Sequence, residues 1–390
     1  MHQGAQDQIR KKFLGILNNI YTNGALGQDS YERYTDIAKA IHKQKERYMS
    51  PEDAKGLILR YIFLLAGSHL GSEKDTLFKD ILDPTVEAER FLDFIKSIPR
   101  EETFYFPLPN IIIENSIELG EASSLSIEPL EKISRKESTE PDQRRTYFKS
   151  KIKGYCGFTT SSVGYNMALI QFKVFIERAI AEGIFYAEPY DSLPAQVSRV
   201  ASSRTQMNYA IDHVDPTGPT TTTLPLPIEI SDICGKIKPV NEKKWHTRLP
   251  PITDQLREKL HYLDRIFKSE KKQIQRLKSA SEWAFDSLSA ERDTMQLLQL
   301  CIGLESIYGD DVGSDGLTEK LSDRCAYSLA KSHEERERIK SEFRELYKIR
   351  SKIVHGVSSQ LSSDERKQLS YGRELLRHSI SKEILLHSED

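Results

Sequence analysis

The sequence predicts an α+β fold in the N-terminal and middle regions, followed by an all-α helical bundle, and a protein that is mainly α overall. Apolar residues recur at spacings of three and four through residues 1–98 and again from 251 to 390, which is typical of amphipathic helices. Between them, residues 99–250 contain short alternating segments broken by proline and glycine, which predict strands. We therefore expect a helical N-terminal region (1–98), an α+β domain (99–250) and a helical bundle (251–390).

The composition is typical of a soluble globular protein. A chain of 390 residues, with 38% apolar and 29% charged residues, is long enough to bury a sizeable core. The net charge of −2 gives no overall field that would attract nucleic acid, so any such site must be a local patch. There is no run of about eighteen apolar residues and no apolar signal-peptide core, so we expect a cytoplasmic protein without membrane contact.

The four cysteines argue against a metal site. Cys156, Cys234, Cys301 and Cys325 are scattered and include no Cys-x-x-Cys pair, which is unlike a zinc site and fits a reducing cytoplasm. The sequence also contains no glycine-rich phosphate loop. We therefore expect neither a metal nor another cofactor.

The first region carries several helical signals. Residues 9–21 have apolar side chains at helical spacing, and Ser50 followed by Pro51 predicts a capped helix start. The body of that helix, residues 57–70, is apolar nearly all round, which predicts burial. Residues 84–98 predict a further short helix.

The middle region changes to strand-like periodicity. We expect strands at residues 103–106, 110–119, 124–128 and 144–154, with an exposed polar loop at 134–143. A helix follows at about 165–182, where apolar residues return to helical spacing. The threonine run and Leu-Pro-Leu-Pro segment within 220–230 predict an edge strand or extended segment, because proline cannot donate to a central ladder.

The last of these expected strands has a basic face. Because side chains alternate along a strand, Arg145, Tyr147, Lys149, Lys151 and Lys153 share one side. Cations with a tyrosine among them can hold a phosphate backbone and stack a base, so these are candidate RNA-binding residues. The alternative is the solvated side of a two-faced antiparallel sheet.

The Asp212-His213-Val214-Asp215 segment combines residue types that can bind metal. Its neighbours Pro216 and Gly218 are typical of a turn, and aspartates cap turns by hydrogen bonding to the backbone. We therefore favour an Asp-rich turn over a metal site here.

From residue 251 the helical pattern continues to the end. Residues 256–277 have a heptad-like apolar spacing, which predicts either a bundle helix or a dimer seam. Further helices are expected at 291–308, 317–330, 332–355 and 363–386. The last begins at Ser362-Ser-Asp-Glu365, which has the spacing of a capping box. These helices predict a bundle around one core.

Within the bundle, Arg350 and His355 are of residue types that together can cleave RNA. Arg is a permanent planar cation that can fork onto a phosphate, and His moves protons near neutral pH. With the 2′-hydroxyl of RNA as nucleophile, these two groups can cleave the chain without a metal. Arg373 and His378 repeat the spacing, so spacing alone does not single out the first pair.

A helix wheel separates the two residues of the pair. Arg350 borders the buried apolar stripe, whereas Tyr347, Ser351 and His355 follow one another at intervals of four on another side. We expect Gly356 to end the helix and to leave His355 at its C-terminus. In the alternative interpretation, Arg350 pairs with a carboxylate and His355 only caps the helix.

The segment Leu346-Tyr-Lys-Ile-Arg-Ser-Lys-Ile-Val-His-Gly356 resembles the signature of the HEPN superfamily, in particular its Apea-like branch. In that signature an Arg is followed by a polar residue and then by a His, places that Arg350, Ser351 and His355 fill. Residues 297–308 resemble the second helix of the branch and residues 321–330 the third. The resemblance extends over roughly residues 283–386, and the Arg373 pair lacks the polar neighbour and the Val-His-Gly ending.

The resemblance implies roles for particular residues. Arg350 and His355 would be catalytic in an Arg-x-x-x-x-His motif of an HEPN-like bundle. Ser351, Tyr347, Glu305 and Arg324 would support them, and Glu305 and Arg324 would organise the site without touching the scissile bond.

The resemblance also implies an activity, a metal-independent RNA endonuclease with a composite site at a homodimer interface formed by the helical bundle. Proteins of the ApeA type act in bacterial antiviral defence, so an abortive-infection effector with a phage-derived activator is expected. The front half would then be a sensor or regulator, by analogy alone. The alternative is a catalytically inactive HEPN-like binding module or a toxin-antitoxin module.

Overall fold

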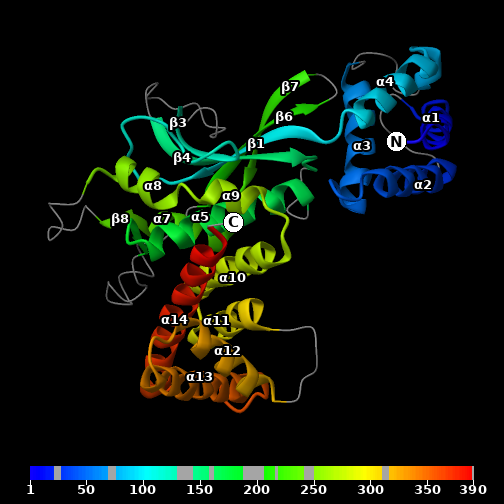
Figure 1. Ribbon diagram of the computed structural model, residues 1–390. Helices are drawn as coiled ribbons and strands as arrows, with labels where there is room; N and C mark the ends of the chain where they lie inside the picture. Colours follow the sequence, from blue (N-terminus) through cyan, green and yellow to red (C-terminus); the bar gives the residue numbers. More distant parts are fainter. Residues whose placement is uncertain are drawn as a thin grey trace.

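The computed structural model describes residues 1–21, 28–68, 76–129, 144–157, 162–187, 206–215, 218–240, 250–309 and 316–388. It has three parts (Figure 1): an N-terminal helical lobe, a central antiparallel sheet backed by helices, and a C-terminal set of helices. The α+β front followed by an all-α C-terminal region confirms the fold class expected from the sequence. No helix in these described ranges combines the length and the hydropathy needed to cross a bilayer.

The N-terminal lobe has a core of its own. It consists of α1 (Gln3–Leu17), α2 (Gln28–Lys45), α3 (Pro51–Ser68), the 3-10 turn η1 (Phe78–Asp80) and α4 (Pro84–Lys96). Phe13 of α1 stacks on Phe91 of α4 with ring centroids 3.9 Å apart, and both side chains are fully buried. The predicted start of α3 is confirmed, because the Asp53 backbone N–H donates to Ser50 Oγ at 3.0 Å.

The central sheet has six antiparallel strands in the order β2-β3-β4-β1-β6-β7. Their bounds are β1 (Arg100–Pro107), β2 (Ile117–Glu118), β3 (Ser123–Pro129), β4 (Arg144–Gly154), β6 (Asn208–Asp215) and β7 (Gly218–Pro225). The proline-flanked threonine run forms β7, an edge strand as expected. The expected loop at 134–143 lies outside the described residues.

One expected strand is mostly irregular. Within residues 110–119, only Ile117 and Glu118 pair with a neighbour. Ile111 and Ile113 are buried while Ile112 is 79% exposed, so the side chains alternate as in a strand. This part of the segment nevertheless pairs with no neighbouring strand among the described residues. The Asn110 side chain instead donates to the backbone oxygen of Gly235 at 2.7 Å, which fastens this segment to α7 (Ile228–Lys236).

Helix α5 (Val163–Ala181) lies between the sheet and the C-terminal helices. Phe172 stacks on Phe106 of β1 at 4.8 Å and packs edge-on against Phe285 of α10 (Lys272–Ser289) at 6.3 Å. A small second sheet, β5 (Phe185–Ala187) with β8 (Ile237–Pro239), follows α5. The buried apolar residues form one continuous core from β1 to the last helix.

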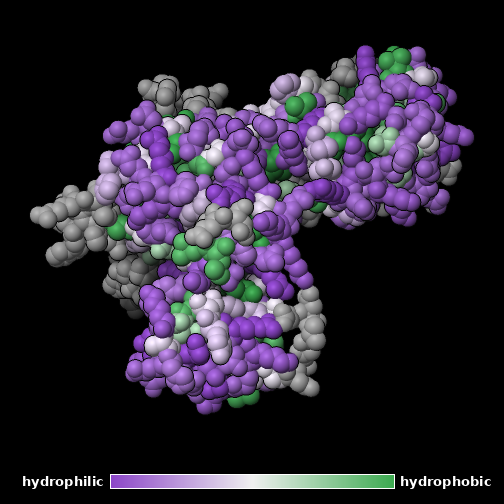
Figure 2. All heavy atoms as spheres, in the orientation of Figure 1, coloured by the Kyte–Doolittle hydropathy of each residue, from purple (hydrophilic) through white to green (hydrophobic). Residues whose placement is uncertain are grey.

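The C-terminal region is helical throughout its described residues. Its elements are α8 (Ile252–Leu260), α9 (Leu263–Lys268), α10, α11 (Asp293–Tyr308), α12 (Leu317–Leu329), α13 (His333–Val354) and α14 (Ser363–Ser388). The predicted capping box is confirmed: Ser362 N–H donates to Glu365 Oε2 at 2.9 Å, and Glu365 N–H donates to Ser362 Oγ at 3.3 Å. Figure 2 shows a mainly hydrophilic outer surface, with apolar atoms gathered where the end of α14 meets the middle region.

The heptad-like segment 256–277 is not one helix. The helix is interrupted at His261–Tyr262 and again at Ser269, whose backbone is extended. Leu256, Leu260 and Leu263 are fully buried in the core of this same chain. Their side chains therefore fill the core that the helices share with the sheet, and they do not lie on a surface that another chain could contact.

Buried charges join α5 to the C-terminal helices. Arg178 is 1% exposed, and its guanidinium donates to Tyr262 Oη at 3.0 Å and to Ser381 Oγ of α14 at 2.9 Å. Glu177 is fully buried, with Arg178 Nη1 at 3.5 Å and Arg377 Nε at 4.0 Å. Burial raises the pKa of the Glu177 carboxyl, and the two guanidinium groups oppose that rise. We call these residues, with Glu182, the α5 ion network.

A second buried cation fixes α5 against α10. Lys173 is 8% exposed, and its Nζ lies 2.9 Å from Glu282 Oε1 and 2.9 Å from Asp286 Oδ1. Because a buried cation without carboxylate partners is strongly destabilising, this contact fixes the register between the two helices.

We predict that Arg178→Met lowers the free energy of unfolding by about 3–5 kcal/mol, because it leaves the buried Glu177 charge with only Arg377, 4.0 Å away, as a cationic partner. Urea denaturation of the full chain measures this. The double variant Glu177→Gln/Arg178→Met should lose less, since no lone charge remains. In the matched control Arg344→Met, which breaks an exposed pair with Glu319, the stability should change much less. Equal losses in Arg178→Met and the control would show that the network does not stabilise the fold.

Candidate functional site

Helix α13 carries the Arg-x-x-x-x-His motif. Ser332 caps its start by accepting from the Glu335 backbone N–H at 3.1 Å. Ile339, Phe343, Leu346 and Ile349 form its buried stripe. The helix ends at Val354, and Gly356 has a φ of +70°, in the left-handed region that glycine favours.

The end of α13 is a Schellman motif. The Val357 N–H donates to Lys352 O at 2.8 Å, and the Gly356 N–H donates to Ile353 O at 3.0 Å. His355 is the residue that caps the helix, as the sequence predicted. Its side chain is exposed.

Arg350 pairs with Glu305 of α11. Arg350 Nη2 lies 3.0 Å from Glu305 Oε1, with side chains 29% and 24% exposed. Its guanidinium also lies 5.6 Å from the ring centre of Tyr347. The guanidinium is therefore held from one side by the subunit's own carboxylate and remains partly open to solvent.

Tyr347 is placed differently from the expectation. The helix wheel put it on the side of His355, but it is 5% exposed. Its hydroxyl donates to Cys301 O at 3.2 Å, and its ring stacks on Phe343 at 4.6 Å. Burial raises the pKa of this phenol, so it stays protonated and serves as a packing residue under Arg350. The cause is α11, which packs over this side of α13 and widens the buried stripe.

Ser351 and His355 lie on the open side of α13. Both are exposed, and the His355 backbone N–H donates to Ser351 O at 3.0 Å. Neither side chain forms a hydrogen bond to any described residue. An ideal helix rotates residues five apart by about 140° and separates them by about 7.5 Å along the axis. A single chain therefore does not bring Arg350 and His355 together on one face.

Arg324 of α12 does not pair with Glu305. Its Nη1 donates to the backbone oxygen of Tyr308, the last residue of α11, at 2.8 Å. It thus satisfies an otherwise open carbonyl at the helix end. Arg324 and Arg350 both fasten α11, one at its end and the other one turn earlier.

An open cleft adjoins Glu305. It has a volume of about 520 Å³ and lies between α10, α11 and the start of α12, where Gly309 and Leu317 form part of the wall. Lys272 and Arg276 of α10 line its other side. Glu305, which holds Arg350, therefore also lines an open cleft that carries two basic residues on its other side.

The exposed end of α13 also carries apolar side chains. Val354 is 58% exposed and Val357 is 76% exposed, on either side of His355. The end of α13 therefore exposes two apolar side chains close to His355 in the sequence.

The basic face of β4 is only partly available. Arg145 and Lys153 are exposed and Lys149 and Lys151 are half-buried, but Tyr147 is 1% exposed. Tyr147 packs with Tyr105 and Ala210 from the neighbouring strands. The expectation that Tyr147 stacks a base is therefore wrong for this conformation, because its ring is covered by residues far away in sequence.

The second Arg and His pair is separated by packing. The Arg373 guanidinium donates to Gln296 Oε1 at 3.0 Å, and burial lowers its pKa. His378 is exposed on α14. The Arg373 side chain therefore holds α14 to α11 within the same chain.

Sequence reasoning missed a buried cluster where the N-terminal lobe meets the sheet. Arg60 of α3 donates to Asp215 Oδ2 at 3.0 Å. The Asp212–Asp215 segment belongs to strand β6 and is not the turn that the sequence predicted. Cys156 and His213 line a cavity of about 10 Å³ beside this pair. The partners are too far apart in sequence for any local signal to have revealed the cluster.

This cluster lacks the features of a nucleophilic site. Burial raises the pKa of the Cys156 thiol and lowers that of His213 to about 4, so the thiol stays protonated and the ring neutral. Burial also raises the pKa of Glu102 to about 7. In the parts of the chain that the structure describes, no group of three or more His, Cys, Asp or Glu side chains is arranged to hold a metal ion.

Comparison with known proteins identifies no relative. No protein-family model, no curated protein and no solved structure matches this chain. The resemblance of α11, α12 and α13 to the HEPN pattern therefore rests on the residues themselves.

We predict that Glu305→Gln lowers the free energy of unfolding by about 1 kcal/mol, since the pair with Arg350 is about one quarter exposed and solvent screens it. Chemical denaturation of the purified chain measures the loss. Glu319→Gln, in the more exposed pair with Arg344, is the matched control and should change stability by less. If Glu305→Gln is as stable as the unchanged protein, the pair does not hold α11 to α13.

Proposed function

We propose that this protein is a metal-independent RNA endonuclease of the HEPN type, with a composite active site formed where two copies meet at α13. The observation that carries the proposal is the geometry at the end of α13. Arg350 is oriented by Glu305 yet partly open, and His355 is exposed at a helix C-terminus. The guanidinium of Arg350 and the imidazole of His355 are thus both accessible to a substrate.

The chemistry follows from the residue types. A deprotonated 2′-hydroxyl attacks the adjacent phosphorus, and the bond to the 5′-oxygen of the next nucleotide breaks. His355 of one subunit takes the proton from the 2′-hydroxyl, and its symmetry mate gives a proton to the leaving 5′-oxygen. Arg350 stabilises the added negative charge on the phosphate oxygens. The products carry a 2′,3′-cyclic phosphate and a 5′-hydroxyl.

The need for two copies follows from the separation within one chain. Arg350 and His355 diverge by about 140° on α13, so one copy cannot direct both at a single phosphate. A two-fold axis beside His355 would bring Arg350 and His355 of one copy close to Arg350 and His355 of the other. Val354 and Val357 supply apolar surface for such a contact.

We take two groups of basic residues as the candidate contacts for RNA phosphates. Lys272 and Arg276 line the cleft beside Glu305, and Arg145, Lys149, Lys151 and Lys153 follow strand β4. Because the net charge of the chain is only −2, local patches of this kind are the available means of attracting a polyanion.

Our proposal for the biological role of the protein is based on the same resemblance to the HEPN superfamily. The protein would act in the cytoplasm as an antiphage defence effector of the abortive-infection kind. A phage-derived activator would be sensed by the lobe and sheet that precede the bundle. The α5 ion network gives a physical route from that sheet to α14.

A second candidate function is a catalytically inactive binding module, for example one partner of a toxin-antitoxin pair. The Arg350–Glu305 ion pair and the helix-capping position of His355 are the observations that favour it. In that case both residues stabilise the bundle, and neither contacts RNA.

We predict that His355→Ala lowers the RNA cleavage rate at least about 100-fold without changing the thermal midpoint, because the side chain is exposed and lends no core volume. Arg350→Ala should lower the rate similarly and also reduce stability by about 1 kcal/mol, since it leaves Glu305 unpaired. Arg350→Lys should restore stability more than rate, because the ammonium group cannot fork onto a phosphate. Ser351→Ala should have an intermediate effect.

His378→Ala is the matched control, an exposed histidine on α14 that should leave the rate unchanged. Cleavage rates and melting curves are measured on the same preparations. A His355→Ala protein that melts normally and cleaves at the full rate would favour the binding module.

We predict that Val354→Asp converts the dimer to a monomer and abolishes cleavage while the fold is retained, because it places a charge on the exposed apolar end of α13. Val86→Asp, on a valine of α4 that is 45% exposed, should change neither property. Sedimentation and RNA cleavage are compared at the same concentration. A Val354→Asp monomer that still cuts RNA would exclude the composite site.

A further inference from the structure

The N-terminal lobe and the sheet, which have separate apolar cores, meet at a contact made of buried side chains. Helix α3 is the part of the lobe nearest to the sheet (Figure 1), and its Arg60 donates to Asp215 of β6 at 3.0 Å. Tyr155, which directly follows β4, packs into the core of the lobe. We call this contact between α3, the ends of β1 and β6, and residues 155–157 the lobe junction.

One buried carboxylate of the lobe junction has donors on both sides of it. Asp53 of α3 is 1% exposed, and its Oδ2 accepts from the Ser50 N–H at 2.9 Å and from the Val163 N–H of α5 at 3.3 Å. Gly157 leaves room for this carboxylate, because a side chain at that position would collide with it. α3 is therefore held close against the chain that follows β4.

A second buried carboxylate, Glu102 of β1, is less well compensated. Glu102 is 2% exposed, and its Oε2 has no hydrogen-bond partner among the described residues. Burial raises the pKa of the Glu102 carboxyl to about 7; the nearby Cys156 N–H and the Arg100 charge oppose the rise, and the Asp53 carboxylate adds to it. The junction therefore accommodates the ionised form of Glu102 poorly.

Charged and titratable groups surround Glu102 from every element of the lobe junction: Asp53 and Arg60 of α3, Arg100 of β1, Tyr155 and Cys156 after β4, and His213 and Asp215 of β6. Burial raises the pKa of Tyr155 and Cys156 and lowers that of His213 to about 4, so all three stay neutral near pH 7. Asp215 is paired with Arg60. In the described part of the chain, Glu102 is therefore the group of the junction expected to change charge near neutral pH.

We propose that the lobe junction is a pH-sensitive contact in which the protonation of Glu102 controls whether the N-terminal lobe stays docked on the sheet. With Glu102 protonated, Asp53 is the one charged partner of the two and the lobe stays docked. Ionised Glu102 adds a second buried carboxylate charge, and opening of the junction returns that charge to water. The junction lies outside the proposed ribonuclease site, so docking can be measured without RNA.

The direction of the pH dependence follows from the two states of the junction. A glutamate in water ionises near about pH 4.3, whereas Glu102 in the docked junction holds its proton up to about pH 7. Because the open state releases the proton first, opening becomes more favourable as the pH rises through this range and changes little above it. Acid therefore tightens the docking of the lobe.

Cys156 is a natural reporter of the junction. It is 2% exposed and lines the small cavity beside Arg60, whereas Cys234, Cys301 and Cys325 are fully buried elsewhere in the chain. The full chain is labelled with N-ethylmaleimide, and peptide mass mapping gives the rate for each cysteine. Each rate is divided by that of the urea-unfolded chain at the same pH, because the thiolate is the reactive form.

From pH 5.5 to pH 8 the normalised rate at Cys156 should rise at least about tenfold in the unchanged protein, since each pKa unit is a factor of ten. It should stay constant in Glu102→Gln, which cannot ionise. Glu101→Gln, at the exposed neighbour on β1, is the matched control and should behave like the unchanged protein.

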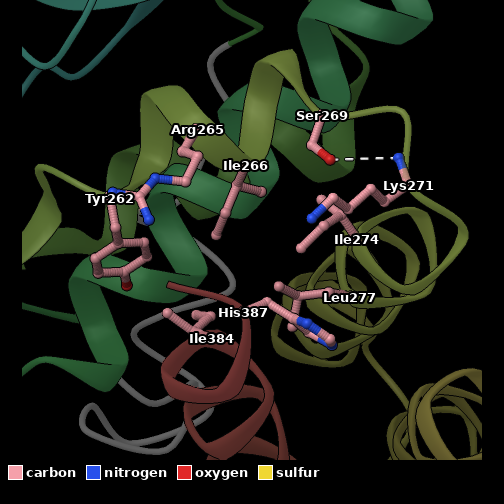
Figure 3. A pocket seen from close by; sticks show the side chains of 9 residues that line it. All are labelled: Tyr262, Arg265, Ile266, Ser269, Lys271, Ile274, Leu277, Ile384 and His387. Atoms are coloured by element: carbon pink, nitrogen blue, oxygen red, sulfur yellow. Dashed lines mark hydrogen bonds between the residues drawn. The ribbon is translucent and has the colours of Figure 1, made fainter. Parts of the chain in front are cut away.

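A second control concerns histidine, which changes charge in the same pH range. His387 lines a different cavity, between α9, α10 and α14 (Figure 3), so His387→Gln should keep the full pH dependence at Cys156.

A normalised Cys156 rate that does not change with pH in the unchanged protein would overturn the proposal. The same pH dependence in Glu102→Gln would also overturn it, because another group would then be titrating. Parallel acceleration at all four cysteines would show that the whole chain unfolds and that the lobe does not open by itself. The unchanged protein decides the question even if Glu102→Gln fails to fold.

Discussion

Arg178 is the point at which the sheet layer and the C-terminal helices depend on each other. An arginine that is 1% exposed must have its donors satisfied. Its partners are Glu177 of α5, Glu182 at the end of α5, Tyr262 between α8 and α9, and Ser381 of α14. A buried charge tolerates little displacement of its partners, because each lost contact leaves a desolvated group unpaired. α14 is therefore fixed relative to the sheet, and the apolar core is continuous across that contact.

The geometry of the proposed site follows from this arrangement. α14 packs against α11 and α13, where Gly303 and Gly372 leave room for Leu376 and Leu346. With α11 held in this way, Glu305 lies within 3.0 Å of Arg350 and fixes one side of its guanidinium. The remaining freedom is at the exposed end of α13. A change in the sheet would therefore reach α13 through α14.

Local signals in the sequence predicted local structure well. Gly356 ended α13, Ser362 and Glu365 capped α14, and alternation over 144–154 marked β4, since each depends only on nearby residues. Properties set by distant partners could not be predicted. Tyr147 and Tyr347 are buried by other strands and by α11, and Ser381 lies 203 residues beyond Arg178. The apolar spacing of residues 256–277 continued across two interruptions of the helix, because buried turns also place apolar residues inward.

The chemical identity of the cleavage products tests the central claim most directly. RNA is incubated with the purified protein in excess EDTA, and the ends of the fragments are identified by mass spectrometry. The account predicts that cleavage continues and leaves 2′,3′-cyclic phosphate and 5′-hydroxyl ends, and that DNA of the same sequence is not cut. Loss of cleavage in EDTA that added Mg²⁺ restores, or products with 3′-hydroxyl and 5′-phosphate ends, would contradict it.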